Sequence, residues 1–162
     1  MSIDAREFRN ALGHFPTGVV VVTAPVDGRE PLAMTVSSFN AVSLDPPLVL
    51  FSIARTAPSL AALLAAPRYA ISVLRHDQSD LSTRFAFARD EKWHGLEPAL
   101  GETGCPLIRP CLATFECTPF ATYEGGDHLI IVGRVERFDT APEGDPLVFF
   151  RGSYHNIAAR AA

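Results

Sequence analysis

Two short segments of the chain concentrate hydroxyl side chains directly after apolar runs. The first is Met34 to Asn40, Met-Thr-Val-Ser-Ser-Phe-Asn, and the second is Ser52 to Ser59, Ser-Ile-Ala-Arg-Thr-Ala-Pro-Ser. Hydroxyls, backbone N–H groups and an arginine can together hold the phosphates of a nucleotide. Serine and threonine also commonly satisfy turns and helix caps. These residue types therefore permit a nucleotide site, and they equally permit ordinary structural roles.

The familiar motifs of nucleotide, hydrolase and metal sites are absent from the sequence. There is no G-x-G-x-x-G fingerprint, Walker A loop, H-E-x-x-H or G-x-S-x-G. Cys105, Cys111 and Cys117 stand six residues apart, which matches neither a disulfide framework nor the Cys-x-x-Cys pairs of zinc sites. We expect buried, reduced thiols and no metal. A bound nucleotide would have to be held without a dedicated phosphate loop.

Length and composition favour one globular domain. The chain has 162 residues, of which 48% are hydrophobic and 20% charged, so it can bury a single core. A net charge of −4 at pH 7 argues against a protein whose main role is to neutralise nucleic-acid phosphates. No apolar run approaches the roughly 20 residues of a membrane-spanning helix, and the N-terminus has no signal-peptide core. We expect one cytoplasmic domain over residues 1–162, with no nucleic acid or membrane among its partners.

Three short helices are expected to attach to the strands. Asp4 with Glu7 resembles a capping box, and Phe8 and Leu12 lie one helical turn apart. Asp77 is a plausible N-cap for a later helix. The predicted helices cover residues 4–13, 58–67 and 77–88, and residues 89–110 are predicted to be irregular.

The remaining apolar segments predict a mainly β fold. The β-branched run 18–24 is typical of a strand buried on both faces, and Asp27-Gly28 behind it is a hairpin signal. Within 112–118, apolar and polar residues alternate, which predicts one buried face and a solvated face that carries Thr114 and Glu116. About seven strands with few helices predict an antiparallel β-barrel with helical attachments. The predicted strands are 18–24, 32–38, 48–53, 69–74, 112–118, 128–138 and 147–150.

An ordered set of segments along nearly the whole chain resembles the flavin reductase family. The resemblance is to the short NAD(P)H:flavin oxidoreductases that supply reduced flavin to two-component monooxygenases. Its segments are Phe8-Arg9-Asn-Ala-Leu-Gly, Phe15-Pro-Thr-Gly-Val, Met34-Thr-Val-Ser-Ser-Phe, Ser43-Leu-Asp-Pro-Pro-Leu-Val-Leu, Phe85-Ala, Gly126-Asp127-His128 and Pro146-Leu-Val-Phe-Phe-Arg-Gly-Ser-Tyr154-His155.

The resemblance implies a fold, cofactors and partners. The fold would be an FMN-binding split barrel, a Greek-key-like antiparallel barrel that forms a homodimer with FMN or FAD near the subunit interface. NADH, with NADPH as the alternative, would be the co-substrate, and a separate flavin-dependent monooxygenase would receive the reduced flavin. Two other functions remain open on the sequence: a flavin-binding split barrel without catalysis, and a split-barrel oxidase or other flavoenzyme that acts on another substrate.

Site residues carry over from the family by position. His128 would contact the nicotinamide as the catalytic residue, although a histidine after a Gly-Gly-Asp turn can also be a solvated turn residue. The expected flavin contacts are Thr35, Val36, Ser37, Ser38, Phe39, Ser52, Ile53, Ala54, Arg55, Thr56, Phe85 and Ala86. The expected nicotinamide-nucleotide contacts are His128, Ser153, Tyr154, His155 and Asn156.

Three aromatic and basic residues near these segments have competing roles. Tyr154 could stack on a planar ring or fill the core with its hydroxyl bonded. Trp93 is expected to anchor the long loop to the domain instead of covering a cofactor. A family lysine position after Ser52 is replaced by Ala57-Pro58. Arg55 is therefore expected to be the only nearby cation for a flavin phosphate.

Overall fold

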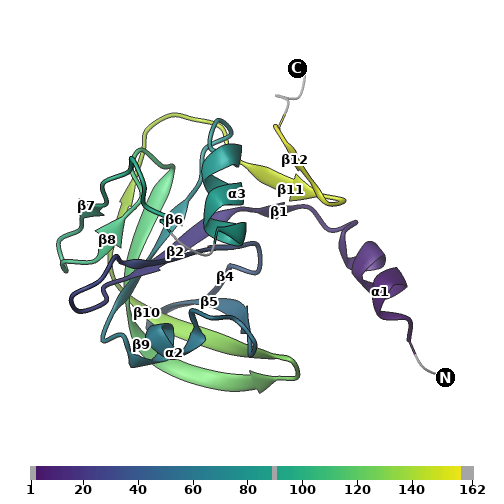
Figure 1. Cartoon of the computed structure of the whole chain (residues 1–162), viewed down its shortest axis with the longest axis horizontal. Coiled ribbons are helices and arrows are strands. Elements are labelled where there is room, and N and C mark those ends of the chain that lie inside the picture. The colour runs from purple at the N-terminus through teal and green to yellow at the C-terminus, as the bar shows by residue number, and fades with distance from the viewer. Residues whose placement is uncertain (1–2, 89–90, 158–162) are drawn as a thin grey trace.

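The computed structural model describes residues 3–88 and 91–157, and Figure 1 shows the arrangement of its elements. The helices are α1 (Ala5–Leu12), α2 (Leu60–Ala65) and α3 (Ser79–Phe87). The strands are β1 (Thr17–Gly18), β2 (Val20–Ala24), β3 (Leu32–Val36), β4 (Asn40–Leu44), β5 (Pro47–Ala54), β6 (Tyr69–Val73), β7 (Ala99–Leu100), β8 (Pro106–Leu107), β9 (Ala113–Gly125), β10 (His128–Thr140), β11 (Val148–Phe150) and β12 (Ser153–His155).

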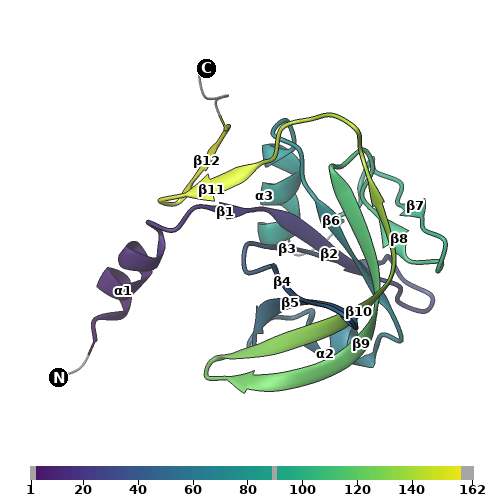
Figure 2. The same ribbon diagram turned by 180° about the vertical axis from the view of Figure 1, so that it is seen from behind.

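One curved sheet dominates the fold. Its seven strands run in the order β3-β2-β6-β9-β10-β5-β4, and every pairing within it is antiparallel. Seen from both sides, the sheet bends so that β2 and β3 lie across from β5 and β10 (Figures 1 and 2). The remaining strands form a small sheet β1-β11-β12 and the pair β7-β8. The prediction of a mainly antiparallel β fold with short helices is confirmed.

Strand β2 lies at the centre of the apolar packing, as its unbroken β-branched sequence predicts. Val20 and Val22 belong to a core cluster beneath α2, whereas Val21 belongs to a second cluster beneath α3. All five residues of β2 are buried. The predicted hairpin at residues 27–28 is also confirmed, because β2 pairs directly with β3. These two clusters fix α2 and α3 on opposite faces of the same strand.

The three helices lie close to their predicted positions. The Asp4 carboxylate accepts N–H bonds from Arg6 at 3.0 Å and Glu7 at 2.8 Å, so it caps α1 as expected. The N-cap of helix α3 lies one residue later than predicted, at Gln78 in place of Asp77. None of the helices in the described part of the chain is long and apolar enough to cross a membrane.

The predicted solvated face of β9 is wrong. Thr114 is 3% exposed and Glu116 is 4% exposed. A turn from the irregular region covers Glu116, whose carboxylate accepts bonds from the backbone N–H of Glu102 at 3.0 Å and of Thr103 at 2.8 Å, and from the Thr103 hydroxyl. A buried carboxylate is stable here because these donors replace its water shell.

The sequence patterns did not predict several strands or parts of strands. Strand β4 pairs with β5 along an edge, and its exposed residues show no clean alternation. Strand β12 has only three residues and follows a tight turn after β11. The short pair β7-β8 lies within the region predicted to be irregular. Strand β9 also continues well beyond residue 118, because β10 pairs with it over its whole length.

The three cysteines are buried and free, which confirms the prediction for them. Burial raises the pKa of each thiol, and that of Cys117 reaches about 12. A thiolate is therefore disfavoured at neutral pH, so these cysteines have structural rather than nucleophilic character.

The substitution Gly133→Ala should destabilise the protein. A Cβ at Gly133 would overlap the Tyr69 hydroxyl and stand 2.9 Å from its Cζ, and Tyr69 is fully buried. We expect the free energy of unfolding to fall by about 1–3 kcal/mol, as for other overpacked cores. Urea denaturation checks this value. Gly18→Ala is the matched control, because a Cβ there meets no atom within 4 Å and its backbone is not left-handed. An unchanged midpoint for Gly133→Ala would contradict the close approach.

Candidate functional site

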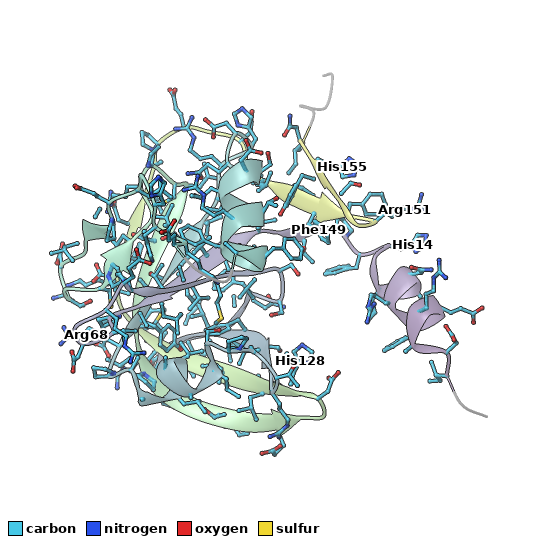
Figure 3. The ribbon with its side chains drawn as sticks, viewed as in Figure 1. His14, Arg68, His128, Phe149, Arg151 and His155 are labelled. Carbon is cyan, nitrogen blue, oxygen red and sulfur yellow. The ribbon has the colours of Figure 1, made fainter. Side chains whose placement is uncertain are left out.

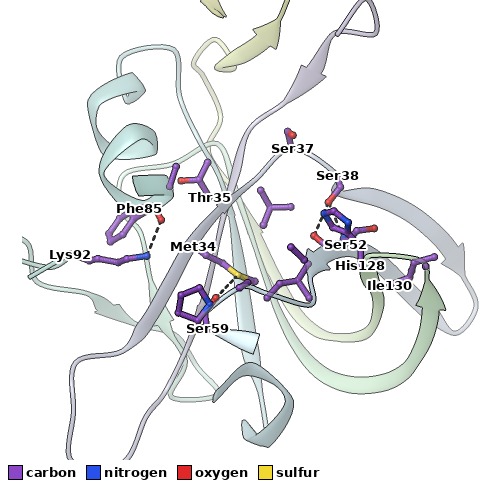
Figure 4. Close-up of a pocket in the computed structure, with 17 residues that line it drawn as sticks. Met34, Thr35, Ser37, Ser38, Ser52, Ser59, Phe85, Lys92, His128 and Ile130 are labelled. Atoms are coloured by element: carbon purple, nitrogen blue, oxygen red, sulfur yellow. Dashed lines mark hydrogen bonds between the residues drawn. The ribbon is translucent and has the colours of Figure 1, made fainter. Parts of the chain in front are cut away.

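A cavity lies between the two halves of the curved sheet (Figure 4). Its volume is about 590 Å³, within the roughly 300–1,000 Å³ of typical small-molecule sites. Its walls come from the end of β3 and the loop behind it, the end of β5, the segment before α2, the end of α3 and the start of β10. The lining residues are Met34, Thr35, Val36, Ser37, Ser38, Ser52, Ile53, Ala54, Ala57, Pro58, Ser59, Phe85, Ala86, Lys92, Gly125, His128 and Ile130.

A serine pair ties the two walls of this cavity together. The Ser38 hydroxyl accepts a bond from the Ser52 backbone N–H at 2.9 Å and donates one to the Ser52 carbonyl at 3.2 Å. Ser38 follows β3, whereas Ser52 belongs to β5, and these strands are not neighbours in the sheet. The serine side chain therefore supplies a cross-link where backbone pairing is missing.

The substitution Ser38→Ala should loosen the cavity without unfolding the protein. It removes both bonds to Ser52, each worth about 0.5–1.5 kcal/mol, at a position already exposed to solvent. We expect the affinity for a ligand in the cavity to fall by about 3- to 10-fold. Isothermal titration with FMN measures this change. Ser43→Ala on β4, outside the cavity, is the control, and an unchanged affinity for Ser38→Ala would show that the cross-link does not shape the site.

The walls combine apolar surface with hydroxyls and a single lysine. Val36, Ile53 and Ile130 contribute aliphatic surface, and none of the lining residues is a carboxylate. The Thr35 hydroxyl is held on the Ser82 carbonyl at 2.6 Å, which fixes this wall against α3. Burial lowers the pKa of Lys92. The cavity thus suits a flat, largely apolar ligand that carries acceptor or anionic groups.

His128 lies at one end of the cavity, near Ser38 and Ser52, and Lys92 lies at the other end (Figure 4). As the first residue of β10, His128 pairs with Ala54 of β5. Its Nδ1 is 2.7 Å from the Asp127 carboxylate. This contact lowers the pKa of Asp127, mainly through the hydrogen bond and then through charge. The carboxylate orients the imidazole so that Nε2 is left for other partners.

Most of the predicted flavin-contact residues meet in this cavity. The residues that line it are Thr35, Val36, Ser37, Ser38, Ser52, Ile53, Ala54, Phe85 and Ala86. Phe39 instead packs on Phe115, with ring centroids 5.7 Å apart. Arg55 donates to the Gly126 carbonyl at 2.9 Å and forms an ion pair with Glu124. Arg55 and Thr56 do not line the cavity. The expectation that Arg55 is the only cation near a flavin phosphate is wrong, because Lys92 lines the cavity.

The predicted nicotinamide residues are not gathered at one place. His128 lines the cavity, whereas Ser153, Tyr154 and His155 form β12 in the small sheet, and Asn156 follows it. Figure 3 shows His155 near Phe149 and far from His128. The Tyr154 hydroxyl is 2.8 Å from the Ser82 hydroxyl, and its ring packs on Phe149. Of the two roles considered for Tyr154, the structure shows the packed one with its hydroxyl bonded.

Several lining residues were not among the expected flavin contacts, although Met34, Ala57, Pro58 and Ser59 belong to the two hydroxyl-rich segments. They are Met34, Ala57, Pro58, Ser59, Lys92, Gly125 and Ile130. Most are neighbours of predicted residues, but Lys92 comes from the long irregular region. Trp93 beside it is buried, with its indole N–H donating to the Pro31 carbonyl at 2.7 Å, which confirms the predicted anchor. This anchor is what carries Lys92 to the cavity, so a lone tryptophan in a loop was the available signal.

The chain is similar to known proteins over nearly its whole length. Residues 12–158 match the flavin reductase like domain. The chain is 39% identical over 157 residues to the reductase subunit HsaB of a flavin-dependent monooxygenase from Mycobacterium tuberculosis, covering 96% of this chain and 83% of that one. It is 46% identical over 151 residues to the FMN reductase (NADH) SmoA from Agrobacterium fabrum, covering 93% of this chain and 85% of that one.

A solved structure extends the likeness to three dimensions. The NADH:FAD oxidoreductase SgcE6 from Streptomyces globisporus, in complex with NAD and FAD fragments, superposes with a TM-score of 0.92 at 36% identity. The alignment covers 100% of this chain and 99% of that one. With the family match over residues 12–158, these similarities show that the chain belongs to the flavin reductase family.

Proposed function

We propose that this protein is an NAD(P)H:flavin oxidoreductase, which transfers a hydride from NADH to FMN or FAD. The observation that carries the proposal is the cavity of about 590 Å³ with aliphatic walls and a hydroxyl-rich edge. A tricyclic isoalloxazine needs flat apolar surface for its faces and donors for its carbonyl edge. Val36 and Ile53 offer the apolar surface, and the Thr35–Ser38 segment offers the donors.

The residues of the cavity have positioning roles in this proposal. Flavin and nicotinamide supply the redox chemistry themselves when they lie stacked. The chain holds the two rings close and keeps their orientation, which is the larger share of what a protein can contribute to such a step. His128, fixed by Asp127 at the end opposite Lys92, is proposed to contact the nicotinamide side of the complex.

We further propose that reduced flavin passes to a separate flavin-dependent monooxygenase. The names of the relatives support this: one is the reductase subunit of a flavin-dependent monooxygenase, and a structural neighbour is the flavin reductase component of a two-component tryptophan halogenase. NADH is the favoured donor because relatives are described as NADH-dependent. The single domain over residues 1–162 is proposed to act in the cytoplasm, where this donor is produced.

A homodimeric split barrel is proposed as the working form. Helix α1 extends away from the main sheet (Figure 1) and buries none of its residues. Its apolar side chains Phe8 and Leu12 are about half exposed, and Phe15 behind it is 76% exposed. Such apolar surface is typical of an interface. In a dimer, the nicotinamide contacts proposed for Ser153, His155 and Asn156 would be made to the cavity of the second copy.

An anaerobic assay tests the proposed function. The protein is mixed with NADH and with either FMN or FAD under argon, and flavin absorbance is followed at about 450 nm. We expect bleaching well above the rate without protein. Flavin binding without bleaching would overturn the reductase in favour of a binding protein. Retention of all reduced flavin on the protein, when a dialysis membrane separates it from an acceptor, would instead favour a self-contained flavoenzyme.

A further inference from the structure

Arg55 joins the end of β5 to the turn that carries His128. The β9–β10 hairpin, the long green pair of strands in Figure 2, closes with a two-residue loop, because Gly125 pairs with His128. Strand β5 pairs with β10 on its other side, and the last residue of β5 lies opposite His128. Arg55 follows directly, so it lies beside the loop made by Gly126 and Asp127.

Both carbonyls of this loop accept hydrogen bonds from Arg55. The Arg55 backbone N–H donates to the Asp127 carbonyl at 2.9 Å, and its Nε–H donates to the Gly126 carbonyl at 2.9 Å. The guanidinium also forms an ion pair with Glu124, on the β9 side of the turn. Because carbonyls in a two-residue hairpin loop have no partner in the strand ladder, these bonds hold the loop in one orientation.

The contacts of Arg55 extend to the imidazole through Asp127. The ion pair alone would contribute little, since the side chains of Arg55 and Glu124 are 41% and 80% exposed. The two loop carbonyls, however, fix the backbone on which the Asp127 carboxylate stands. That carboxylate lies 2.7 Å from the His128 Nδ1. Arg55 thus holds the loop, and the loop holds the ring of His128 at the cavity.

We propose that Arg55 is a positioning residue for the nicotinamide nucleotide, acting through the turn of residues 124–128 and His128. This inference rests on the function proposed above, in which His128 contacts the nicotinamide side of the complex. Arg55 does not line the cavity, whereas His128 does. Without the side chain of Arg55, the loop would adopt its present orientation for only part of the time. The apparent affinity for the nucleotide would fall in proportion to that fraction.

A double-mutant cycle with His128 tests this role. The variant Arg55→Met removes the Nε donor and the charge but keeps an aliphatic stem. We expect the KM for NADH to rise by about 3- to 10-fold, while kcat and the dissociation constant for FMN change by less than about twofold. In the His128→Ala background, Arg55→Met should change this KM by less than about twofold, because the imidazole it positions is gone. Arg55→Lys should give an intermediate KM, since it keeps the charge opposite Glu124 but lacks the Nε–H.

Amide hydrogen exchange measures the turn without reference to activity. Exchange in residues 124–128 should be faster in Arg55→Met than in the wild type, because the loop opens more often. Arg134→Met is the matched control: it removes an arginine whose Nε lies 3.9 Å from the Glu136 carboxylate, on the same strand β10. This control should leave the KM for NADH and the exchange of the turn unchanged.

Each other outcome counts against the proposal. If Arg55→Met weakens the binding of FMN but not of riboflavin, Arg55 contacts the flavin phosphate itself and the positioning role is overturned. Unchanged exchange or an unchanged KM in Arg55→Met would overturn it as well, as would additive effects in the cycle. An unchanged KM in His128→Ala would instead contradict the proposed contact between His128 and the nicotinamide. Failure of the wild type to oxidise NADH would contradict the proposed function.

Discussion

The substitution Ala54→Trp should exclude flavin from the cavity and raise the dissociation constant for FMN by about 100-fold or more, because an indole would occupy the space of the ring. Ala54 lines the cavity at the end of β5 and pairs with His128 across the strands. Its side chain is half-buried, so the larger residue fills the cavity and leaves the two core clusters unchanged. Fluorescence titration with FMN and the anaerobic NADH assay should both lose their signal.

The loss of FMN binding should depend on where the tryptophan is introduced and not on its size alone. Ala61→Trp, on the exposed face of α2 outside the lining, introduces the same side chain and should bind FMN normally. Thermal unfolding of both variants separates a blocked cavity from a damaged fold, since both should melt within a few degrees of the wild type. Affinity for FMN within threefold of normal in Ala54→Trp would place the flavin elsewhere on the protein.

Local sequence patterns predicted the elements that pack on both faces. The run that became β2 is mostly β-branched, which favours a buried strand, and the turn residues after it favour a hairpin. Local patterns did not predict strand β4, because it lies at the edge of the sheet and its Val42 and Leu44 are exposed. Edge strands depend on pairing with a neighbour far more than on their own pattern, so their positions are set by the tertiary fold.

The parts of the candidate site that lie at strand ends could be predicted from the sequence, whereas the part that a loop supplies could not. Thr35 and Ser52 lie near the ends of patterned strands, so their segments could be proposed in advance, and the curved sheet then brought them together. Lys92 depends on contacts between Trp93 and Pro31 that are long-range in the chain. The same kind of contact explains the burial of Glu116, because period-two alternation assigns polar residues to solvent unless another segment covers them.

Because that turn covers Glu116, loss of this side chain should cost considerable stability. The variant Glu116→Ala leaves the backbone N–H groups of Glu102 and Thr103 without acceptors and leaves a cavity beneath the turn. A buried donor that loses its acceptor typically costs about 1–3 kcal/mol, so the loss of both acceptors should cost about 2–6 kcal/mol. At about 2–4 °C per kcal/mol for a chain of this size, the melting temperature should fall by roughly 10 °C. Glu116→Gln keeps one acceptor oxygen and should lose less.

A double-mutant cycle with Gly101 separates this network from a general loss of packing. A Cβ at Gly101 would overlap the Glu116 carboxylate, so Gly101→Ala should itself destabilise the wild type by about 1–3 kcal/mol. In the Glu116→Ala background the same change meets empty space and should cost little. The two effects are therefore expected to be non-additive by about 1 kcal/mol or more. Strict additivity in urea denaturation would mean that the carboxylate does not hold the 101–104 turn, since residues that do not touch have no reason to couple.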